Sequence, residues 1–134
     1  MTYKLEYICG RHYNGLSEIN DLIYIERCFE LALKGDTAVA HSPMVGCVIV
    51  HNNQIIGEGY HKAYGTDHAE VVAINSVADD ALLRESTIYV NLEPCAHFGK
   101  TTPCADLIIS RKLKTVVISN LDPHDKVAEQ GIEK

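Results

Sequence analysis

The sequence lacks any excess of positive charge. Its 134 residues hold twelve Lys and Arg against eighteen Asp and Glu, which gives a formal net charge of −6. A protein that binds nucleic acid mainly by neutralising phosphates needs a clustered excess of cations. The composition therefore argues against that class of protein, and we expect no nucleic-acid partner.

Long apolar runs are also missing. No stretch reaches about 18 consecutive apolar residues, the length that a membrane-spanning helix needs. Residues 1–10 mix charged residues and tyrosines where a signal peptide has an apolar core. These absences predict a cytoplasmic protein with no membrane partner. Disulfides are rare in that compartment, so the five cysteines, an odd number, are expected to be free thiols or metal ligands.

The chain does contain alternating helix and strand patterns, typical of one α/β domain. Helical spacing of apolar residues predicts helices over 20–35, 68–78 and 105–112. Runs rich in β-branched residues predict strands over 45–50, 54–60, 87–92 and 115–119, with a tight hairpin turn at Asn52 and Asn53. Strands joined through a helix are expected to run parallel. The order α-β-β-α-β-α-β therefore predicts a three-layer α-β-α fold. In the first helix, the predicted apolar face is made by Leu22, Ile25, Phe29 and Ala32.

Three short segments indicate metal chemistry: H-A-E at 68–70, P-C at 94–95 and P-C at 103–104. A catalytic zinc takes three protein ligands and leaves its fourth position to water, and one His with two Cys is a common set. His68 and Cys104 each open a predicted helix, and a helix N-terminus favours a thiolate at Cys104. The pattern predicts a catalytic Zn2+ bound by His68, Cys95 and Cys104.

Glu70 follows His68 by two residues. Positions i and i+2 of a helix diverge by about 200°, so Glu70 need not face the same metal and can instead shuttle the proton of a metal-bound water. The pattern H-x-E followed by P-C and a second Cys is that of the zinc deaminases, although eight residues rather than two separate Cys95 from Cys104 here.

Less specific interpretations also exist for these residue types. A purely structural zinc would need a fourth protein ligand, for which His97 is the candidate, but that leaves Glu70 without a role. An isolated cysteine is usually a small core residue, which is our interpretation of Cys9, Cys28 and Cys47.

Two longer motifs, G-E-G-Y-H at 57–61 and L-E-P-C-A-H-F-G-K-T-T-P-C at 92–104, resemble the deaminase domain of the bifunctional riboflavin biosynthesis enzyme. The segments V-G-C-V-I-V at 45–50, G-x-x-H-A-E-V at 65–71 and D-P at 122–123 also fall where that family places them. The wide spacing of the two cysteines separates this family from relatives of the transfer-RNA adenosine, guanine and cytosine types. The resemblance covers roughly residues 21–134.

The resemblance implies a cytidine-deaminase-like α/β fold with a mixed sheet. It also implies a zinc-dependent hydrolase that deaminates 2,5-diamino-6-ribosylamino-4(3H)-pyrimidinone 5′-phosphate to the 5-aminouracil nucleotide plus ammonia. By position, His68, Cys95 and Cys104 would bind zinc and Glu70 would be the catalytic proton shuttle. Substrate contacts are implied at His61, His97 and Lys100, and a homo-oligomer, either dimer or tetramer, as the assembly. The alternatives are a solvated loop cation at Lys100 and an orienting role for the two histidines.

Two features depart from the family pattern. Ser42-Pro43 stands where the family usually has Asn-Pro, and that Asn contacts the substrate ring. Ser offers one shorter hydroxyl in place of an amide, so we expect Ser42→Asn to raise kcat/KM. We expect the partner reductase domain to be absent and the last helix and strand of the deaminase domain to be truncated. We expect residues 1–20 to be an N-terminal extension and residues 21–134 to be the deaminase domain.

Two other functions stay open at this point. The chain could be a different zinc deaminase, of the guanine or deoxycytidylate type. It could also be an inactive, zinc-stabilised module that serves binding. Ammonia release from a panel of substrates distinguishes these alternatives.

Overall fold

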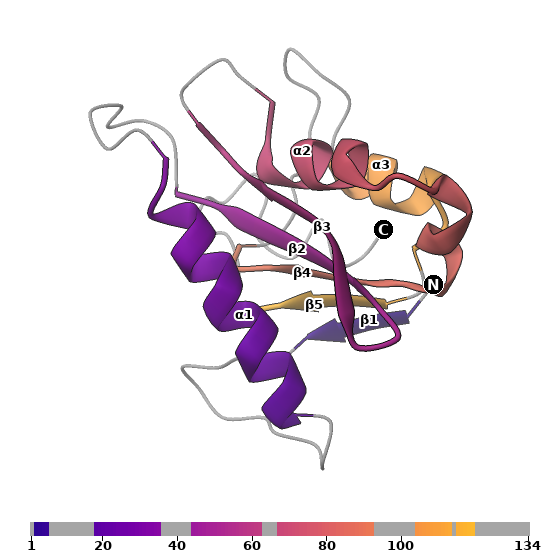
Figure 1. Ribbon diagram of the computed structural model, residues 1–134, viewed down its shortest axis with the longest axis horizontal. Helices are drawn as coiled ribbons and strands as arrows, with labels where there is room; N and C mark the ends of the chain where they lie inside the picture. Colours follow the sequence, from indigo (N-terminus) through magenta and orange to yellow (C-terminus); the bar gives the residue numbers. More distant parts are fainter. Residues whose placement is uncertain are drawn as a thin grey trace.

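The computed structural model describes residues 2–5, 18–35, 44–62, 67–92, 104–113 and 115–119. Figure 1 shows a twisted sheet with helices packed against it. In chain order, the elements are β1 (Thr2–Leu5), α1 (Glu18–Ala32), β2 (Gly46–His51), β3 (Gln54–Tyr60), α2 (Ala69–Ser76), the 3-10 helix η1 (Asp80–Glu85), β4 (Thr87–Val90), α3 (Cys104–Ser110) and β5 (Thr115–Ile118).

The sheet has five strands in the order β1-β5-β4-β2-β3. Strand β2 pairs antiparallel with both β3 and β4, whereas β5 pairs parallel with both β4 and β1. The sheet is therefore mixed, as the sequence predicted. The parallel pair β4 and β5 is connected through α3, which agrees with the expectation for strands joined by a helix.

The turn between β2 and β3 lies where the two asparagines predicted it. Asn52 and Asn53 have φ angles of 49° and 61°, in the left-handed region. A two-residue turn of this kind needs positive φ at both positions, and asparagine tolerates that conformation better than most residues. The local sequence therefore determines the turn of the hairpin.

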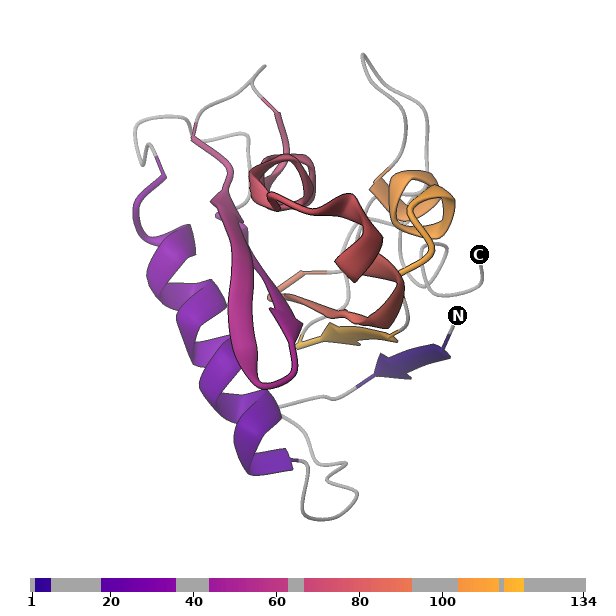
Figure 2. The ribbon, with the colours of Figure 1, turned by 45° about the vertical axis from the view of Figure 1, so that its right-hand side comes forward.

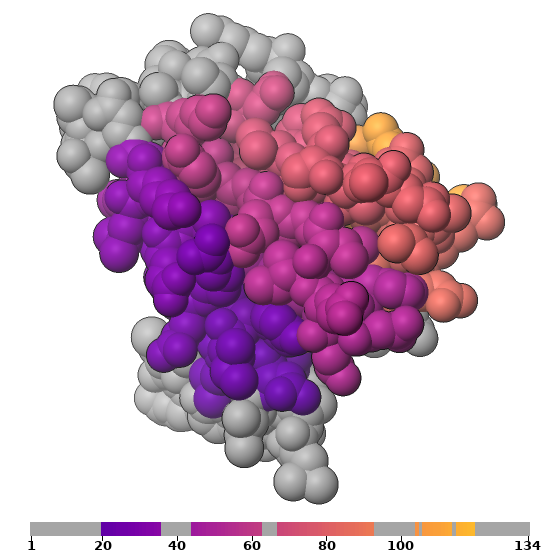
Figure 3. All heavy atoms as spheres, viewed as in Figure 1, coloured from indigo at the N-terminus to yellow at the C-terminus, as the bar shows by residue number. Residues whose placement is uncertain are grey.

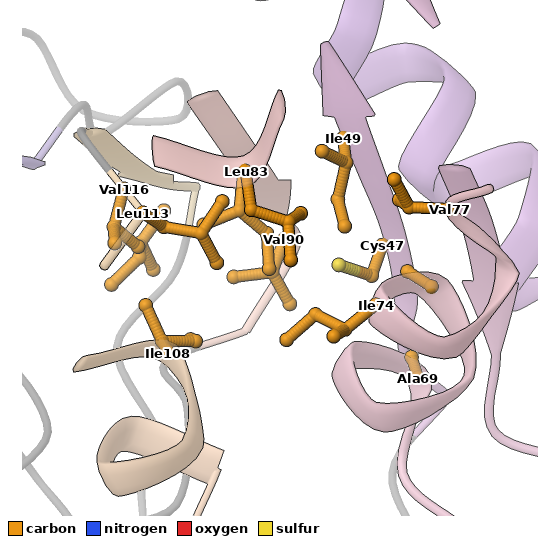
Figure 4. Close-up of a cluster of buried hydrophobic side chains, with 13 residues drawn as sticks. Cys47, Ile49, Ala69, Ile74, Val77, Leu83, Val90, Ile108, Leu113 and Val116 are labelled. Atoms are coloured by element: carbon orange, nitrogen blue, oxygen red, sulfur yellow. The ribbon is translucent and has the colours of Figure 1, made fainter. Parts of the chain in front are cut away.

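The helices form two outer layers, with α1 on one side of the sheet and α2 with α3 on the other (Figure 2). Side chains alternate between the two faces along each strand. One core cluster, on the α1 side, contains Ile25, Cys28, Leu31, Val48, Val50, Tyr89 and Val117. The other cluster (Figure 4) contains Cys47, Ile49, Ala69, Ala73, Ile74, Val77, Leu83, Ile88, Val90, Ile108, Leu113, Val116 and Ile118. This arrangement confirms the three-layer α-β-α fold.

Two glycines allow the helices to approach the sheet closely. A Cβ atom at Gly46 would lie 1.9 Å from the carbonyl oxygen of Cys28 in α1. A Cβ atom at Gly59 would lie 2.5 Å from the carbonyl oxygen of Ala69, the first residue of α2. Because no side chain fits between these backbones, the two glycines fix where α1 and the start of α2 rest on the sheet.

The space-filling view in Figure 3 shows α1 beside the β2–β3 hairpin. The Arg27 guanidinium in α1 donates to both carboxylate oxygens of Glu58 in β3, over 2.6 Å from Nε and 3.1 Å from Nη2. It holds the pKa of the Glu58 carboxyl below its usual value. This ion pair joins the helix to the edge strand.

Three local features differ from the prediction. Strand β1 lies within residues 1–20, where no element was expected, because its pairing with β5 rather than a local pattern makes it a strand. The 3-10 helix η1 was not predicted either; the Asp79 side chain accepts from the Ala81 N–H at its start. Phe29 is 40% exposed, since α1 rests on Gly46 through Cys28 and Ala32 and so turns Phe29 away from the core.

No helix within the described ranges is long and apolar enough to cross a membrane. Residues 120–134 lie outside the described residues, so the expected truncation of the last helix and strand stays a prediction.

Candidate metal and active site

The described residues with predicted chemical roles lie at one edge of the sheet. Gly46, at the start of β2, pairs with Tyr60, at the end of β3, and the neighbouring Cys47 pairs with Val90, at the end of β4. His61 directly follows β3, and the close approach of Gly59 to Ala69 brings the start of α2 to the same edge. Catalytic and ligand sites of α/β sheets commonly form at such an edge, where several loops and helix ends meet.

His68 and Cys104 are in direct contact there. The Nδ1 atom of His68 lies 3.2 Å from the Sγ atom of Cys104, although 36 residues separate the two in the chain. His68 is the N-cap residue of α2, and Cys104 is the first residue of α3. The Cys104 side chain is buried, with 1% of its surface exposed, while His68 is exposed. The fold therefore brings two of the three predicted zinc ligands together.

Glu70 lies in the first turn of α2, next to this pair. Its residue is only 4% exposed, which is unusual for a carboxylate. The contact between Gly59 and Ala69 sets the depth at which this turn lies against the sheet. The structure thus places a buried carboxylate one helical turn or less from the His68–Cys104 contact.

His61 packs against His68. The two imidazole rings meet edge to face, with their centroids 5.5 Å apart and their planes at 89°. The Nδ1–H of His61 donates to the carbonyl oxygen of Asp67 over 3.2 Å, since a carbonyl can only accept. The main-chain N–H of His61 donates to the carbonyl oxygen of Val45 over 3.0 Å. These contacts hold His61 beside the predicted metal ligand.

Two other cysteines are buried in the core, as the sequence predicted. Cys28 and Cys47 are free thiols with no exposed surface, one on each face of the sheet. Burial raises the pKa of both thiols well above its usual value, which keeps them protonated and unreactive. The Cys28 Sγ–H donates to the carbonyl oxygen of Tyr89 over 3.3 Å. Cys9 lies outside the described residues.

Four of the predicted site residues also lie outside the described residues: Ser42, Cys95, His97 and Lys100. Within the described ranges no group of three or more potential metal ligands occurs. The ligand set His68, Cys95 and Cys104 is therefore represented in the described part of the chain by His68 and Cys104 alone.

The described pair fits a zinc ion in its donor chemistry. An imidazole nitrogen and a thiolate sulfur are preferred zinc ligands, and bond lengths of about 2.0 and 2.3 Å place two such atoms about 3.5 Å apart around a tetrahedral ion. The observed separation of 3.2 Å between His68 Nδ1 and Cys104 Sγ is close to that value. Small side-chain adjustments suffice for both atoms to bind one ion.

One polar residue at this edge escaped the sequence analysis. Asn91 directly follows β4, is 7% exposed, and accepts a hydrogen bond at Oδ1 from the Gly46 N–H over 2.8 Å. An amide side chain between the apolar Val90 and Leu92 was the signal that could have identified it.

Comparisons with known proteins agree with this geometry. Residues 19–120 match the family model described as the cytidine and deoxycytidylate deaminase zinc-binding region. The diaminohydroxyphosphoribosylamino-pyrimidine deaminase of Buchnera aphidicola from Schizaphis graminum is 47% identical to this chain over 114 residues, which are 85% of this chain and 76% of that protein. The family domain that the chain carries is thus one described as zinc-binding.

Solved structures give the same result. The Thermotoga maritima protein described as a diaminohydroxyphosphoribosylaminopyrimidine deaminase and 5-amino-6-(5-phosphoribosylamino)uracil reductase is 42% identical to this chain, with a TM-score of 0.81. Acinetobacter baumannii RibD in its second form is 39% identical, also with a TM-score of 0.81. The alignments cover 88% of this chain, but only 34% and 33% of those two chains, so the chain spans about a third of the length of these two proteins. The chain belongs to the cytidine and deoxycytidylate deaminase family, among the diaminohydroxyphosphoribosylaminopyrimidine deaminases.

Proposed function

We propose that the chain catalyses the hydrolytic deamination of 2,5-diamino-6-ribosylamino-4(3H)-pyrimidinone 5′-phosphate in riboflavin biosynthesis. The reaction adds water at an amine-bearing ring carbon and releases ammonia, so that the ring carbon becomes the carbonyl of the 5-aminouracil nucleotide. The observation that carries the proposal is the contact between His68 Nδ1 and Cys104 Sγ at 3.2 Å, with the buried Glu70 in the adjoining helical turn. The 47% identity to a relative named as this deaminase supports the choice of substrate.

His68, Cys95 and Cys104 would hold the Zn2+. When bound, the ion acts as a Lewis acid that brings the pKa of a bound water toward neutrality. Two thiolates offset the charge of the ion, and the neutral imidazole of His68 completes the set of three protein ligands. The alternative is a closed structural zinc site with His97 as the fourth ligand. That site would give the buried Glu70 no role.

Glu70 would move the proton. Its carboxylate accepts a proton from the attacking water, and its carboxylic acid then donates that proton to the departing amine, which leaves as ammonia. The carboxylate is regenerated at the end, so the atoms and charges balance over one turnover.

The substrate contacts would come from four residues. His61 lies against His68, which supports a place for it at the rim of the site. We include His97 and Lys100 by their positions in the family motif, with Lys100 at the phosphate end. Ser42 would meet the ring with a single hydroxyl, and Ser42→Asn is expected to raise kcat/KM on the diaminopyrimidine phosphate. No gain from this change would mean that Ser42 does not limit the reaction.

The direct experiment measures ammonia release from the diaminopyrimidine phosphate together with the zinc content of the same preparation. We expect turnover and about one zinc ion per chain. Guanine and deoxycytidylate serve as the comparison substrates, and faster ammonia release from either one would favour a different zinc deaminase. Bound zinc without ammonia release from any of the three would favour the inactive binding module.

A matched pair of cysteine variants tests the assignment of the ligands. Cys104→Ser should lose zinc and turnover together, because a neutral hydroxyl is a poor zinc ligand. Cys28→Ser should retain both, since the serine hydroxyl can donate to the Tyr89 carbonyl oxygen as the thiol does. Equal zinc loss in the two variants would argue against Cys104 as a ligand.

The remaining properties stay predictions. They are a cytoplasmic location, assembly as a dimer or tetramer, and a deaminase domain over 21–134 preceded by an extension at 1–20. Size-exclusion chromatography with light scattering tests the oligomeric state.

A further inference from the structure

The side chain of Asn91 bridges two segments at the active-site edge. Its Oδ1 accepts from the main-chain N–H of Gly46 over 2.8 Å, and its Nδ2–H donates to the carbonyl oxygen of Met44 over 3.1 Å. The amide thus bonds one donor and one acceptor of the same short stretch, as a strand partner would. It continues the pairing of β2 with β4 past the last main-chain partners, Cys47 and Val90.

Hydrogen bonds from Ser119, which directly follows β5, hold the main chain at Asn91 in place. The Ser119 hydroxyl donates to the Asn91 main-chain carbonyl oxygen over 2.9 Å, and the Ser119 N–H donates to the Val90 carbonyl oxygen over 3.2 Å. Both Asn91 and Ser119 are buried, with 7% and 2% of their surfaces exposed. Because hydrogen bonds in such a setting are costly to leave unmade, the amide is held in one orientation.

Segment 44–46, which Asn91 joins to the end of β4, also contacts His61 of the candidate site. The Val45 carbonyl oxygen accepts from the main-chain N–H of His61, whose ring packs against His68. In the sequence, Ser42 precedes Met44 by two residues, and Cys95 follows Asn91 by four. Asn91 therefore joins segment 44–46, which carries the Val45 contact with His61, to the end of β4.

We propose that Asn91 is a positioning residue for substrate binding. Its side-chain amide holds segment 44–46 against the end of β4, and through the Val45 carbonyl oxygen that segment holds His61. This proposal rests on the function proposed above. Asn91 acts through these neighbours and takes no part in proton transfer, so its loss should change substrate binding more than the chemical step.

The test compares Asn91→Ala and Asn91→Asp with the matched control Tyr89→Phe. The aspartate keeps an acceptor for the Gly46 N–H but places a carboxylate oxygen against the Met44 carbonyl oxygen. Tyr89 lies in β4, two residues before Asn91, and its hydroxyl donates to Asp21 on the α1 side, so the control loses a buried hydrogen bond that does not involve segment 44–46. The readouts are KM and kcat for the diaminopyrimidine phosphate, zinc content, and hydrogen exchange of the Gly46 amide.

We expect Asn91→Ala to raise KM by about tenfold or more, with a smaller change in kcat and with zinc retained. Asn91→Asp should lie between Asn91→Ala and the natural chain in KM, and Tyr89→Phe should leave KM unchanged. The Gly46 amide should exchange faster in Asn91→Ala, which removes its acceptor, and not in the control. An unchanged KM in a folded Asn91→Ala chain, or an equal rise in the control, would overturn the proposal.

The exchange measurement separates this proposal from the proposed function. If the natural chain releases no ammonia from the diaminopyrimidine phosphate, the proposed substrate is wrong. The role of Asn91 is then judged from the hydrogen exchange of the Gly46 amide alone. Unchanged exchange of the Gly46 amide in Asn91→Ala overturns the role of Asn91 whatever the activity is.

Discussion

Within the described ranges, two carboxylate residues are buried, one on each side of the sheet. Asp21 in α1 is 5% exposed and Glu70 in α2 is 4% exposed. The Tyr89 hydroxyl donates to Asp21 over 2.6 Å, which ties α1 to β4 on the side of the sheet where none of the described predicted site residues lies. Glu70 instead lies in the helical turn that begins beside the contact between His68 and Cys104. Burial alone therefore does not single out Glu70, the carboxylate that we propose as catalytic; its neighbours do.

Two buried cysteines differ between the two sides of the sheet in the same way. Cys28, on the α1 side, is a core residue whose Sγ–H donates to a main-chain carbonyl oxygen. Cys104, on the other side, is equally buried but meets the imidazole of His68. The α1 layer thus uses its polar groups to join helix to sheet, whereas the layer of α2 and α3 places them at the helix starts. Substitutions in the two layers should affect different properties.

Removing the two carboxylates in turn gives the largest expected difference. Glu70→Ala should lower kcat by about 10²- to 10⁴-fold and retain zinc, because proton transfer is lost while the ligands remain. Asp21→Asn should keep most of the activity and lose about 1–3 kcal/mol of unfolding free energy. Ammonia release, metal analysis and urea denaturation measure the three quantities. Zinc lost together with activity in Glu70→Ala would make Glu70 a ligand or a structural residue.

A methyl group beneath α2 should have the next largest effect. In Gly59→Ala the new Cβ would lie 2.5 Å from the Ala69 carbonyl oxygen and 2.6 Å from the Ala73 nitrogen, so the start of α2 must move. We expect a loss of about 1–3 kcal/mol of unfolding free energy and a lower zinc content.

The control for that change is Gly57→Ala. Its Cβ would lie 2.7 Å from the Ala73 carbonyl oxygen and 2.7 Å from Val77 Cγ2, nearer the other end of α2. A similar loss of stability with zinc retained is expected. If both variants lose zinc equally, a displaced start of α2 does not explain the zinc loss in Gly59→Ala.

The opposite layer should give a loss of stability alone. Tyr89→Phe removes the hydroxyl that donates to Asp21 and leaves the ring contact with Tyr24, whose centroid lies 5.1 Å away. We expect about 1–2 kcal/mol less unfolding free energy in urea denaturation, with kcat/KM unchanged. A changed kcat/KM would mean that the α1 layer also shapes the site.

The ion pair between α1 and the edge strand should give the smallest effect. Arg27 keeps the pKa of Glu58 low, so the stabilisation is fully present above the unfolded-state pKa of about 4.3 and is lost as the pH falls through the lower folded-state pKa. Glu58→Gln should cost about 0.5–1 kcal/mol near neutral pH, since the pair is partly exposed, and less as the pH falls through the folded-state pKa of Glu58. A difference that stays constant with pH would contradict this assignment.

A more exposed pair serves as its control. The Arg111 guanidinium lies 3.2 Å from an Asp80 carboxylate oxygen, and the Asp80 side chain is 69% exposed. Asp80→Asn should leave the unfolding free energy almost unchanged at every pH, because water screens such pairs.

The local sequence predicted the elements whose physical causes are local. The turn at Asn52 and Asn53, the apolar β4 and β5, and the helix start at His68 each depend on residues within a few positions. The local sequence did not predict strand β1, because its four residues acquire strand structure only from their pairing with β5. The exposure of Phe29 also depends on a distant partner, the glycine at 46 beneath α1.

The sequence by itself determined the chemistry of this protein. The H-A-E motif, the two P-C pairs and their spacing specify residue types that a zinc deaminase needs, and the family match agrees with them. Only the tertiary structure decided which of these residues meet. His68 and Cys104 come within 3.2 Å, and Asn91 joins β4 to segment 44–46, because packing on a shared sheet edge brings together residues tens of positions apart. Short-range sequence patterns do not encode such contacts, since their energy exists only once both partners are in place.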